Sequence, residues 1–229
     1  MDGINAMFKF QEIWFPDGEK HFPFWMQKNG EIVNGKGTYQ IKKLREAMKW
    51  CKQFRTAVDV GAHVGLWSMH LAGKFEYVYA FEPVPQFQQC YAENVWQENC
   101  RLNFSALGAT SGHVTMVVPE LHGGIDSGGT HIGIVRTDGQ GIAMKTLDSF
   151  GFDRVDFLKL DVEGYELEVL KGAVETLKRC KPCVIVEQKP HKLLPNFGIK
   201  GTPAVTFLQE MGAIVRKEMG GDWIMSWDA

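Results

Sequence analysis

The 229-residue sequence lacks the marks of membrane-inserted, secreted and nucleic-acid-binding proteins. No apolar run approaches the ~18 residues of a transmembrane helix. The N-terminal stretch MDGINAMFKF carries an acid early and has no apolar core of the kind that signal peptides need. Positive charge is not in excess, because 25 Lys and Arg stand against 27 Asp and Glu, whereas phosphate-binding proteins usually present a basic surface. We therefore expect a cytoplasmic protein with no membrane segment and no nucleic-acid partner.

Cysteine is too scarce to build a disulfide framework. The chain has five cysteines, and an odd number in a protein of this length indicates free thiols in a reducing compartment. Cys180 and Cys183 have the C-x-x-C spacing, but no second such pair completes a zinc site. The pair also follows an expected helix instead of opening one, so nothing lowers its thiol pKa. We interpret both cysteines as structural and predict no metal centre.

Apolar runs that alternate with helical patterns predict an α/β fold. Parallel strands are expected over residues 56–60, 76–81, 102–107, 155–160 and 182–186. Helices are expected over residues 37–54, 64–71, 86–97, 163–179 and 203–211. Residues 213–218 and 223–227 flank a Gly-Gly-Asp turn, and such a hairpin makes its two strands antiparallel. The sequence thus predicts a Rossmann-like, mostly parallel seven-stranded sheet with an antiparallel C-terminal hairpin.

Two segments lie outside this alternation. Residues 7–26 are rich in aromatics around Pro16-Asp17-Gly18, a turn signal, and predict an N-terminal β-hairpin that turns there. We expect residues 1–54 to form a hairpin and helix extension packed on a core of residues 55–229, within one compact domain. Residues 113–119 either extend the sheet or form a hairpin, and residues 121–133 form a polar, glycine-rich loop of the kind that often carries function.

The stretch AVDVGAHVG, residues 57–65, marks the switch from a buried strand to a helix. In open α/β sheets, ligands bind in the crevice beyond the carboxyl ends of the strands. Glu82 ends the next apolar run, 23 residues after Asp59. An acid at that distance suits the two hydroxyls of a ribose, so the sequence predicts a site for a nucleoside cofactor.

The glycine spacing argues against a dinucleotide. The fingerprint G-x-G-x-x-G needs glycine where this chain has His63 and Leu66, and its middle glycine serves to admit a pyrophosphate. S-adenosyl-L-methionine has no pyrophosphate, and Asp59 and Asp161 suit its ammonium and sulfonium. No acid is available for the adenine amino group, which leaves Ser105 or the backbone. A dinucleotide-binding oxidoreductase and a non-catalytic cofactor-binding module remain the alternatives.

Longer motifs give a family resemblance. The blocks VDVGAHVG, YAFEPVP, SALG, KTLDSF and VDFLKLDVEGYELEVLKGA resemble the FkbM-type methyltransferases over residues 56–187. The resemblance implies a class I methyltransferase fold with S-adenosylmethionine as cofactor, and O-methylation of a sugar, glycan or natural-product hydroxyl. It places Asp59, Gly61 and Gly65 on the methionine side, Glu82 at the ribose and Asp161 where methyl transfer occurs. The family usually has Asn where this chain has His63.

The predicted site follows from these readings. The cofactor-binding residues are predicted to be Asp59, Val60, Gly61, His63, Gly65, Leu66, Glu82, Pro83, Ser105, Ala106 and Asp161. An O-methyltransferase must orient the acceptor and take its proton, and histidine and carboxylate are the usual bases. The catalytic candidates are Asp161, Glu187, His131 and His191. Asp161, Glu187 and His191 could instead gather a divalent metal, a less favoured reading.

Overall fold

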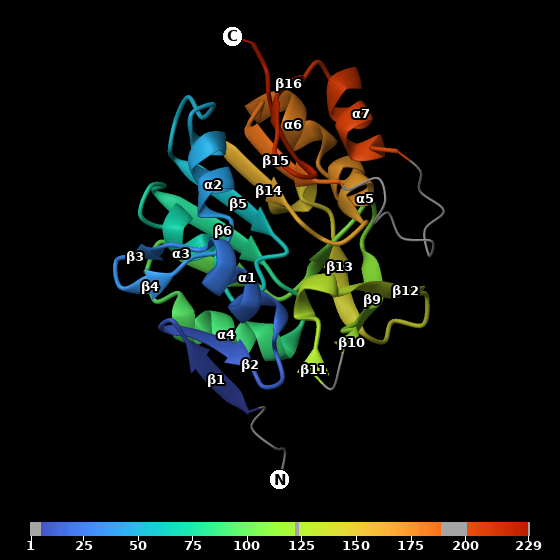
Figure 1. The fold of residues 1–229 in the computed structure, drawn as a ribbon. Coiled ribbons are helices and arrows are strands. Elements are labelled where there is room, and N and C mark those ends of the chain that lie inside the picture. The colour runs from blue at the N-terminus through green and yellow to red at the C-terminus, as the bar shows by residue number, and fades with distance from the viewer. Residues whose placement is uncertain (1–5, 122–123, 189–200, 229) are drawn as a thin grey trace.

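A seven-stranded sheet forms the centre of the computed structural model, which describes residues 6–121, 124–188 and 201–228. The strand order is β16-β17-β15-β14-β5-β6-β7, and β17 runs antiparallel to both of its neighbours (Figure 1). The bounds are β5 Thr56–Val60, β6 Tyr77–Phe81, β7 Cys100–Asn103, β14 Phe157–Leu160, β15 Cys183–Glu187, β16 Ile214–Glu218 and β17 Asp222–Ser226. The expected Rossmann-like architecture is confirmed. The chain order reverses between β5 and β14, and a ligand crevice forms at such a switch point.

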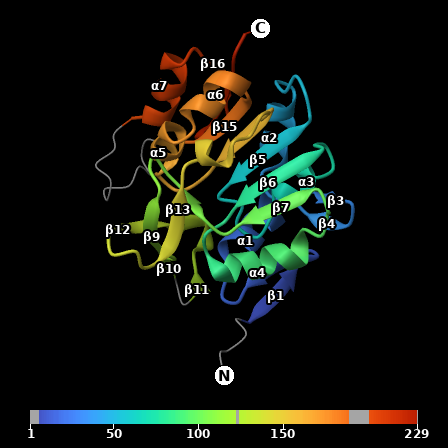
Figure 2. The ribbon, with the colours of Figure 1, turned by 180° about the vertical axis from the view of Figure 1, so that it is seen from behind.

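Helices cover both faces of this sheet, which explains why β5 and β15 are buried throughout. They are α2 Ile41–Met48, α3 Ser68–Leu71, α4 Pro85–Asn94, α5 Glu166–Lys171, α6 Val174–Cys180 and α7 Pro203–Glu210. Val58 and Val60 pack in one core cluster with α5, α6 and α7. The side chain of Ala57 points to the opposite face of the sheet and packs in a second core cluster with α2 and α3. The two helical layers are visible in Figure 2, which shows the molecule from behind.

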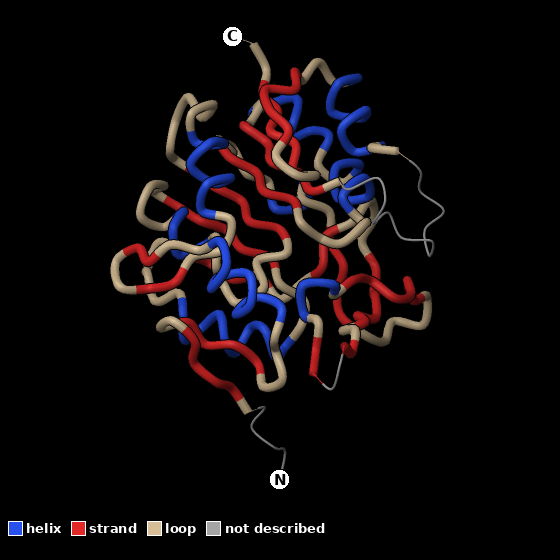
Figure 3. Tube along the Cα trace, in the orientation of Figure 1, coloured by secondary structure: helices blue, strands red, loops and turns tan. Residues whose placement is uncertain are grey.

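A second sheet lies in the chain between β7 and β14. Its order is β12-β9-β13-β8, with β8 Ala106–Leu107, β9 Gly112–Val117, β12 His131–Arg136 and β13 Ile142–Lys145 (Figure 3). The expected strand over residues 102–107 was wrong in extent, because β7 ends at Asn103 and β8 pairs in the second sheet. Residues 121–133 are not one loop: they include the ends of the short hairpin β10 Glu120–Leu121 and β11 Gly124–Ile125, then the 3₁₀ turn η1 Ser127–Gly129.

The N-terminal extension begins with a hairpin, but its turn lies earlier than predicted. β1 Met7–Phe10 and β2 Ile13–Pro16 pair around Gln11 and Glu12, whose φ angles are +48° and +62°. Pro16-Asp17-Gly18 instead leads into α1 His21–Asn29, so the expected hairpin turn at that site was wrong. β3 Ile32–Val33 and β4 Lys36–Gly37 follow, and the helix expected from residue 37 therefore begins only at Ile41.

The extension shares buried side chains with the rest of the chain. Phe15 and Phe22 belong to the same core cluster as Leu66 and Tyr91. The Asn94 amide accepts the backbone N–H of Trp14 at 2.8 Å and donates to its carbonyl at 2.9 Å. The division at residues 54 and 55 stays a prediction. None of the helices within the described ranges has the length and apolar character that a membrane crossing needs.

The helix expected over residues 163–179 is two helices, α5 and α6. Gly172 ends α5, and its backbone lies so close to the Gly108 carbonyl that a Cβ would collide with it. The Asp148 carboxylate then accepts the backbone N–H groups of Glu175 at 3.0 Å and Thr176 at 2.8 Å, which satisfies the exposed start of α6. The break brings the second sheet against the core, and periodicity alone does not reveal it.

Candidate functional site

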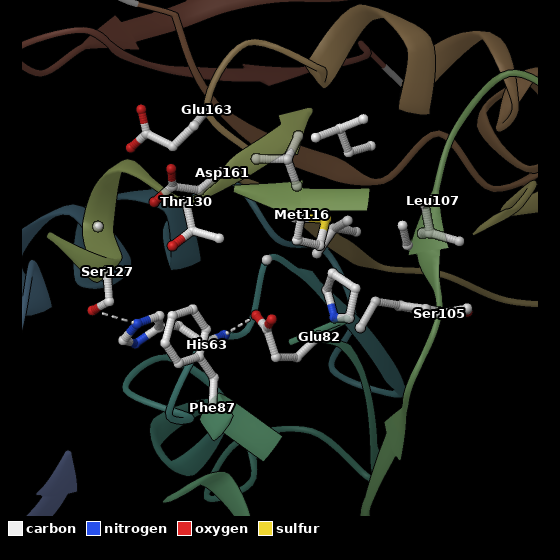
Figure 4. A pocket seen from close by; sticks show the side chains of 18 of the residues that line it. His63, Glu82, Phe87, Ser105, Leu107, Met116, Ser127, Thr130, Asp161 and Glu163 are labelled. Carbon is white, nitrogen blue, oxygen red and sulfur yellow. Dashed lines mark hydrogen bonds between the residues drawn. The ribbon is translucent and has the colours of Figure 1, made fainter. Parts of the chain in front are cut away.

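A cavity of about 650 Å³, partly open to solvent, lies at the carboxyl ends of β5, β6 and β14 (Figure 4). The main sheet supplies one wall and the second sheet another, through Met116 and Ile132. The N-terminal extension contributes Phe22. Segments far apart in the sequence therefore meet around one cavity at the predicted switch point.

Glu82 is the best-anchored acid in the cavity. Its carboxylate accepts the backbone N–H of His63 at 2.8 Å through Oε2 and that of Val84 at 2.9 Å through Oε1. The side chain is buried, and burial raises its pKa to about 7. Each carboxylate oxygen keeps lone-pair capacity after these bonds. The group is thus fixed in place and still able to accept two hydroxyl hydrogens side by side.

Asp161 lies across the cavity, in the turn that follows β14. Gly61 packs against the backbone of that turn so closely that a Cβ would collide with the Asp161 carbonyl oxygen. Glu166 holds the turn from the other side, because its Oε1 accepts the N–H groups of Val162 at 3.1 Å and Gly164 at 3.0 Å. Burial raises the pKa of Glu166 to about 7. Asp161, the first acid of the D-V-E-G-Y-E block, therefore lines the cavity, and Glu166, the last acid, fixes the backbone of the turn.

Asp59 is not among the residues that line the cavity. It is fully buried and pairs in register with Lys159 of β14, whose Nζ lies 3.2 Å from Asp59 Oδ1. The Ser68 hydroxyl donates to its other oxygen at 2.7 Å. Lys159 also donates to the Gly61 carbonyl at 2.7 Å. Although burial opposes its charge, the carboxylates of Asp59 and Asp161 raise the pKa of Lys159. The buried Asp59–Lys159 pair therefore stabilises the glycine turn through the Gly61 carbonyl.

The far end of the cavity is mostly apolar with one unsatisfied hydroxyl. Ser105 and Leu107 lie there together (Figure 4), and Ala106 and Pro83 also line the cavity. The Ser105 hydroxyl is buried and has no hydrogen-bond partner among the described residues. A buried hydroxyl normally has a partner, so its lack of one here fits a planar, hydrogen-bonding ligand.

The cavity brings together most of the predicted cofactor-binding residues. Those that line it are Val60, Gly61, His63, Glu82, Pro83, Ser105, Ala106 and Asp161. Gly65 and Leu66, like Asp59, lie outside the lining. Gly65 has a φ of +91° and would collide with Val95 if it carried a Cβ, so it serves helix packing.

The predicted catalytic residues are divided. Glu187 is nearly buried, and its carboxylate lies within 4.8 Å of ligand atoms of both Asp161 and Glu163. The His131 ring is hydrogen-bonded through Nδ1 to the Gly129 carbonyl at 2.9 Å and is not in the lining. His191 lies outside the described residues. The structure thus brings together Asp161 and Glu187, two of the three residues of the less favoured prediction of a divalent metal site.

Sequence reasoning did not identify Lys159, Glu19 and Ser127 as parts of this region. A lysine inside the apolar run FLKL was the only available signal for Lys159, because a lysine buried in a sheet requires a charged partner. Glu19 carries no local pattern. Ser127 belongs to the glycine-rich stretch over residues 121–133, but that pattern indicates no particular residue, and only the folded chain brings both side chains to the cavity region.

The raised pKa of Glu82 gives a first prediction. A ligand whose hydroxyls need an ionised acceptor should bind with full affinity above pH 7, and affinity should fall toward tenfold per pH unit below it. Stability should move the other way: a carboxyl whose pKa rises from 4.5 to about 7 stabilises the fold below pH 4.5, and that contribution is lost as the pH rises through 7. Calorimetric titration with S-adenosylhomocysteine between about pH 5.5 and 8 measures the first effect. Glu82→Gln should flatten the profile, and an equally steep profile in that variant would exclude Glu82 as its source.

Comparison with known proteins identifies the family. The model of the methyltransferase FkbM domain matches residues 59–213, more than half of the chain. The chain belongs to the FkbM methyltransferase family. The match begins at Asp59 in β5, runs through the D-V-E-G-Y-E block and ends just after α7, so every residue that lines the cavity apart from Phe22 lies within it.

Individual relatives are more distant. The methyltransferase sdnD of Sordaria araneosa is 29% identical over an alignment of 175 residues, which covers 57% of this chain and 64% of that protein. The chain therefore spans less than two thirds of that relative's length. The FkbM methyltransferase structure from Methylobacillus flagellatus KT is similar with a TM-score of 0.49 and 18% identity, over 76% of this chain and 44% of that one. The N-methyltransferase NodS of Bradyrhizobium japonicum WM9 also gives 0.49, at 8% identity over 81% of this chain and 90% of that one.

S-adenosylmethionine is the cofactor of the FkbM family, and the cavity fits it. The fit rests on three features of the lining: the anchored Glu82 carboxylate, the unsatisfied Ser105 hydroxyl and the Asp161 carboxylate. Together they offer an acceptor pair for a ribose, a hydrogen-bonding group for an adenine and a negative charge for a cationic group. The family also sets aside the dinucleotide oxidoreductase reading.

Proposed function

We propose that this FkbM-family chain transfers a methyl group from S-adenosylmethionine to a hydroxyl of a small acceptor, such as a sugar, a glycan or a natural-product-like molecule. The observation that carries the proposal is Glu82. A buried acid at the end of the second core strand, with both oxygens oriented by backbone N–H groups, has the chemistry to bind a ribose diol.

The remaining lining residues support one orientation of the cofactor. Ser105, Pro83 and Ala106 surround the adenine end, and Glu82 holds the ribose. The methionine end then reaches the Gly61 turn and Asp161. The negatively charged Asp161 carboxylate can receive a cationic group there. Asp59 supports this turn through Lys159 and does not touch the cofactor.

The cofactor supplies a methyl group already activated by its sulfonium. The chain must orient the acceptor oxygen in line with that group, exclude water and take the hydroxyl proton. Asp161 is positioned for the last task. Glu163 and Glu187 lie beside it, and ligand oxygens of the three carboxylates lie within 4.8 Å of one another. The proton would move from the acceptor oxygen to an Asp161 carboxylate oxygen as the carbon–oxygen bond forms and the bond between the methyl carbon and sulfur breaks, which leaves S-adenosylhomocysteine.

Ligand-induced stabilisation tests the cofactor assignment. S-adenosylhomocysteine at 100 times its dissociation constant should stabilise the fold by ~2.7 kcal/mol, visible as a raised melting temperature, whereas NAD should leave it unchanged. A panel of sugars and hydroxylated natural products, compared with amines and carboxylates, then tests the acceptor class by product mass. Stabilisation by NAD, or methylation of amines alone, would overturn the proposal. Cofactor binding without turnover on any acceptor would favour a non-catalytic module.

A further inference from the structure

Three side chains from separate parts of the chain form a continuous hydrogen-bonded series beside the cavity. Glu19 follows β2, Ser127 opens η1 and His63 lies in the glycine turn after β5. The Ser127 hydroxyl donates to Glu19 Oε2, and His63 Nε2 lies 2.8 Å from the same hydroxyl oxygen. Figure 4 shows the contact between Ser127 and the His63 ring. Glu19 and Ser127 are 3% and 2% exposed, so water does not compete for these bonds.

The Glu19 carboxylate indicates which groups donate and which accept in this series. The Glu19 carboxylate accepts the backbone N–H of Phe22 at 3.0 Å, the backbone N–H of Ser127 at 3.2 Å and the Ser127 hydroxyl. Because the Ser127 hydrogen is used toward Glu19, its oxygen can only accept from the ring. His63 Nε2 must therefore carry the proton. Burial lowers the pKa of His63 to about 3, so the ring is neutral and Nδ1 holds a lone pair.

Ser127 is the single hydrogen-bond anchor of the ring within the described part of the chain. His63 Nδ1 is buried without a partner there. The rest of the ring is packed between Phe22 and Phe87, with centroid distances of 4.6 and 4.2 Å. Loss of the Ser127 hydroxyl would leave a buried N–H unsatisfied, and such a group costs enough free energy to move the ring or its loop.

His63 links this series to the cofactor site through its own backbone. Its N–H is the donor that orients Glu82 Oε2, at 2.8 Å. Its φ of +52° lies in the left-handed region, which is uncommon for a residue with a side chain. The ring contacts help to hold the residue in that conformation. Where the family usually has Asn, this chain has a larger side chain that reaches both the extension and η1.

We propose that Ser127 and Glu19 are positioning residues for the ribose of the cofactor, acting through His63 on Glu82; this inference rests on the proposed function. Glu19 is not among the residues that line the cavity, and Ser127, which does line it, uses its hydroxyl toward Glu19 and the His63 ring. The Glu19–Ser127 contact joins the N-terminal extension to the second sheet, and the Ser127–His63 contact joins both to the glycine turn. Cofactor binding and the docking of η1 against the extension therefore stabilise each other.

Calorimetry on the full chain tests the positioning role. S-adenosylhomocysteine should bind Ser127→Ala roughly 5- to 20-fold more weakly than the wild type, the range expected when one buried hydrogen bond that orients a ligand contact is lost. Glu19→Gln should also weaken binding, because the amide places an NH₂ donor where the Glu19 carboxylate has a second acceptor oxygen. The control is Ser149→Ala, which removes an exposed hydroxyl bonded to the Thr146 carbonyl at 2.7 Å and should leave affinity unchanged.

A second measurement needs no cofactor. Nitrogen-15 NMR of the His63 ring should show Nε2 protonated and Nδ1 unprotonated in the wild type, and a mixture of the two tautomers in Ser127→Ala. A folded Ser127→Ala variant with wild-type affinity would overturn the positioning role. A wild-type ring protonated on Nδ1 would overturn the series itself. If the wild type does not bind S-adenosylhomocysteine at all, the proposed function fails, and the tautomer result still decides whether the series exists.

Discussion

Replacing Glu82 by alanine should weaken the binding of S-adenosylhomocysteine by at least about 100-fold. A hydrogen bond to a charged group contributes roughly 1.5–3 kcal/mol, and the carboxylate can accept one from each ribose hydroxyl. Loss of both corresponds to more than ~2.7 kcal/mol, which is about 100-fold in affinity. The effect should be large because backbone N–H groups already hold both oxygens in place, and no neighbouring acid among the described lining residues can take their position.

Glu76→Ala is the matched control. Glu76 is exposed at the opposite, amino end of the same strand, so its loss should change affinity by less than about twofold. Both variants should be compared by calorimetry at about pH 8, where Glu82 is ionised. Equal affinity of Glu82→Ala and the wild type would show that the ribose lies elsewhere and would remove the main support for the proposed orientation.

Replacing Gly61 by alanine should destabilise the fold by roughly 2–5 kcal/mol and abolish cofactor binding. A left-handed φ costs a residue with a side chain roughly 1–2 kcal/mol, and a forced contact in a packed interior adds roughly 1–3 kcal/mol. Gly61 has a φ of +74°, and its Cβ would collide with the Asp161 carbonyl oxygen, which is backbone and cannot rotate away.

Gly139→Ala separates these two contributions. Gly139 has nearly the same φ, +72°, but nothing lies within 4 Å of the position that its Cβ would take. Gly139→Ala should lower the free energy of unfolding only by the cost of the left-handed φ, about 1–2 kcal/mol, and should keep full cofactor affinity. Urea unfolding of both variants measures the difference. Equal losses would mean that the turn after β14 adjusts freely and that the close approach of the two turns does not define the site.

The central strands were predictable from the sequence for a clear physical reason. A parallel strand buried on both faces needs a largely apolar run, and residues 56–60, apolar or β-branched apart from Asp59, gave the bounds of β5 to the residue. The place of Glu82 at the ligand crevice was predictable too, because the carboxyl ends of parallel strands all lie at the same edge of the sheet.

Pairing between distant segments was not predictable. Whether residues 106–107 extend β7 or join β13 depends on a partner 38 residues further on, and local propensity carries no such information. The same limit applied to Asp59. Its position at the end of a strand suggested a ligand contact, but its carboxylate is paired with Lys159, 100 residues away, across a register that only folding sets.

The hairpin turn failed for a different reason. Pro-Asp-Gly is a strong local signal, whereas Gln11 and Glu12 have no special preference for the left-handed conformations that they adopt. The packing of Ile13 and Phe15 in the core decides the register of β2, and a one-residue shift would expose both side chains. Burial therefore overrides turn chemistry at this site.

The separation between β5 and β14 has a consequence for synthesis of the protein. β5 is an interior strand of the finished sheet, but its partner on one side, β14, is complete only at Leu160, 100 residues after Val60. At roughly 5–20 residues per second, a ribosome needs about 5–20 s to supply that partner. During this interval the nascent chain presents an apolar strand with one open edge, a template for wrong pairing. Chaperone capture should therefore be strongest on chains halted between these two strands.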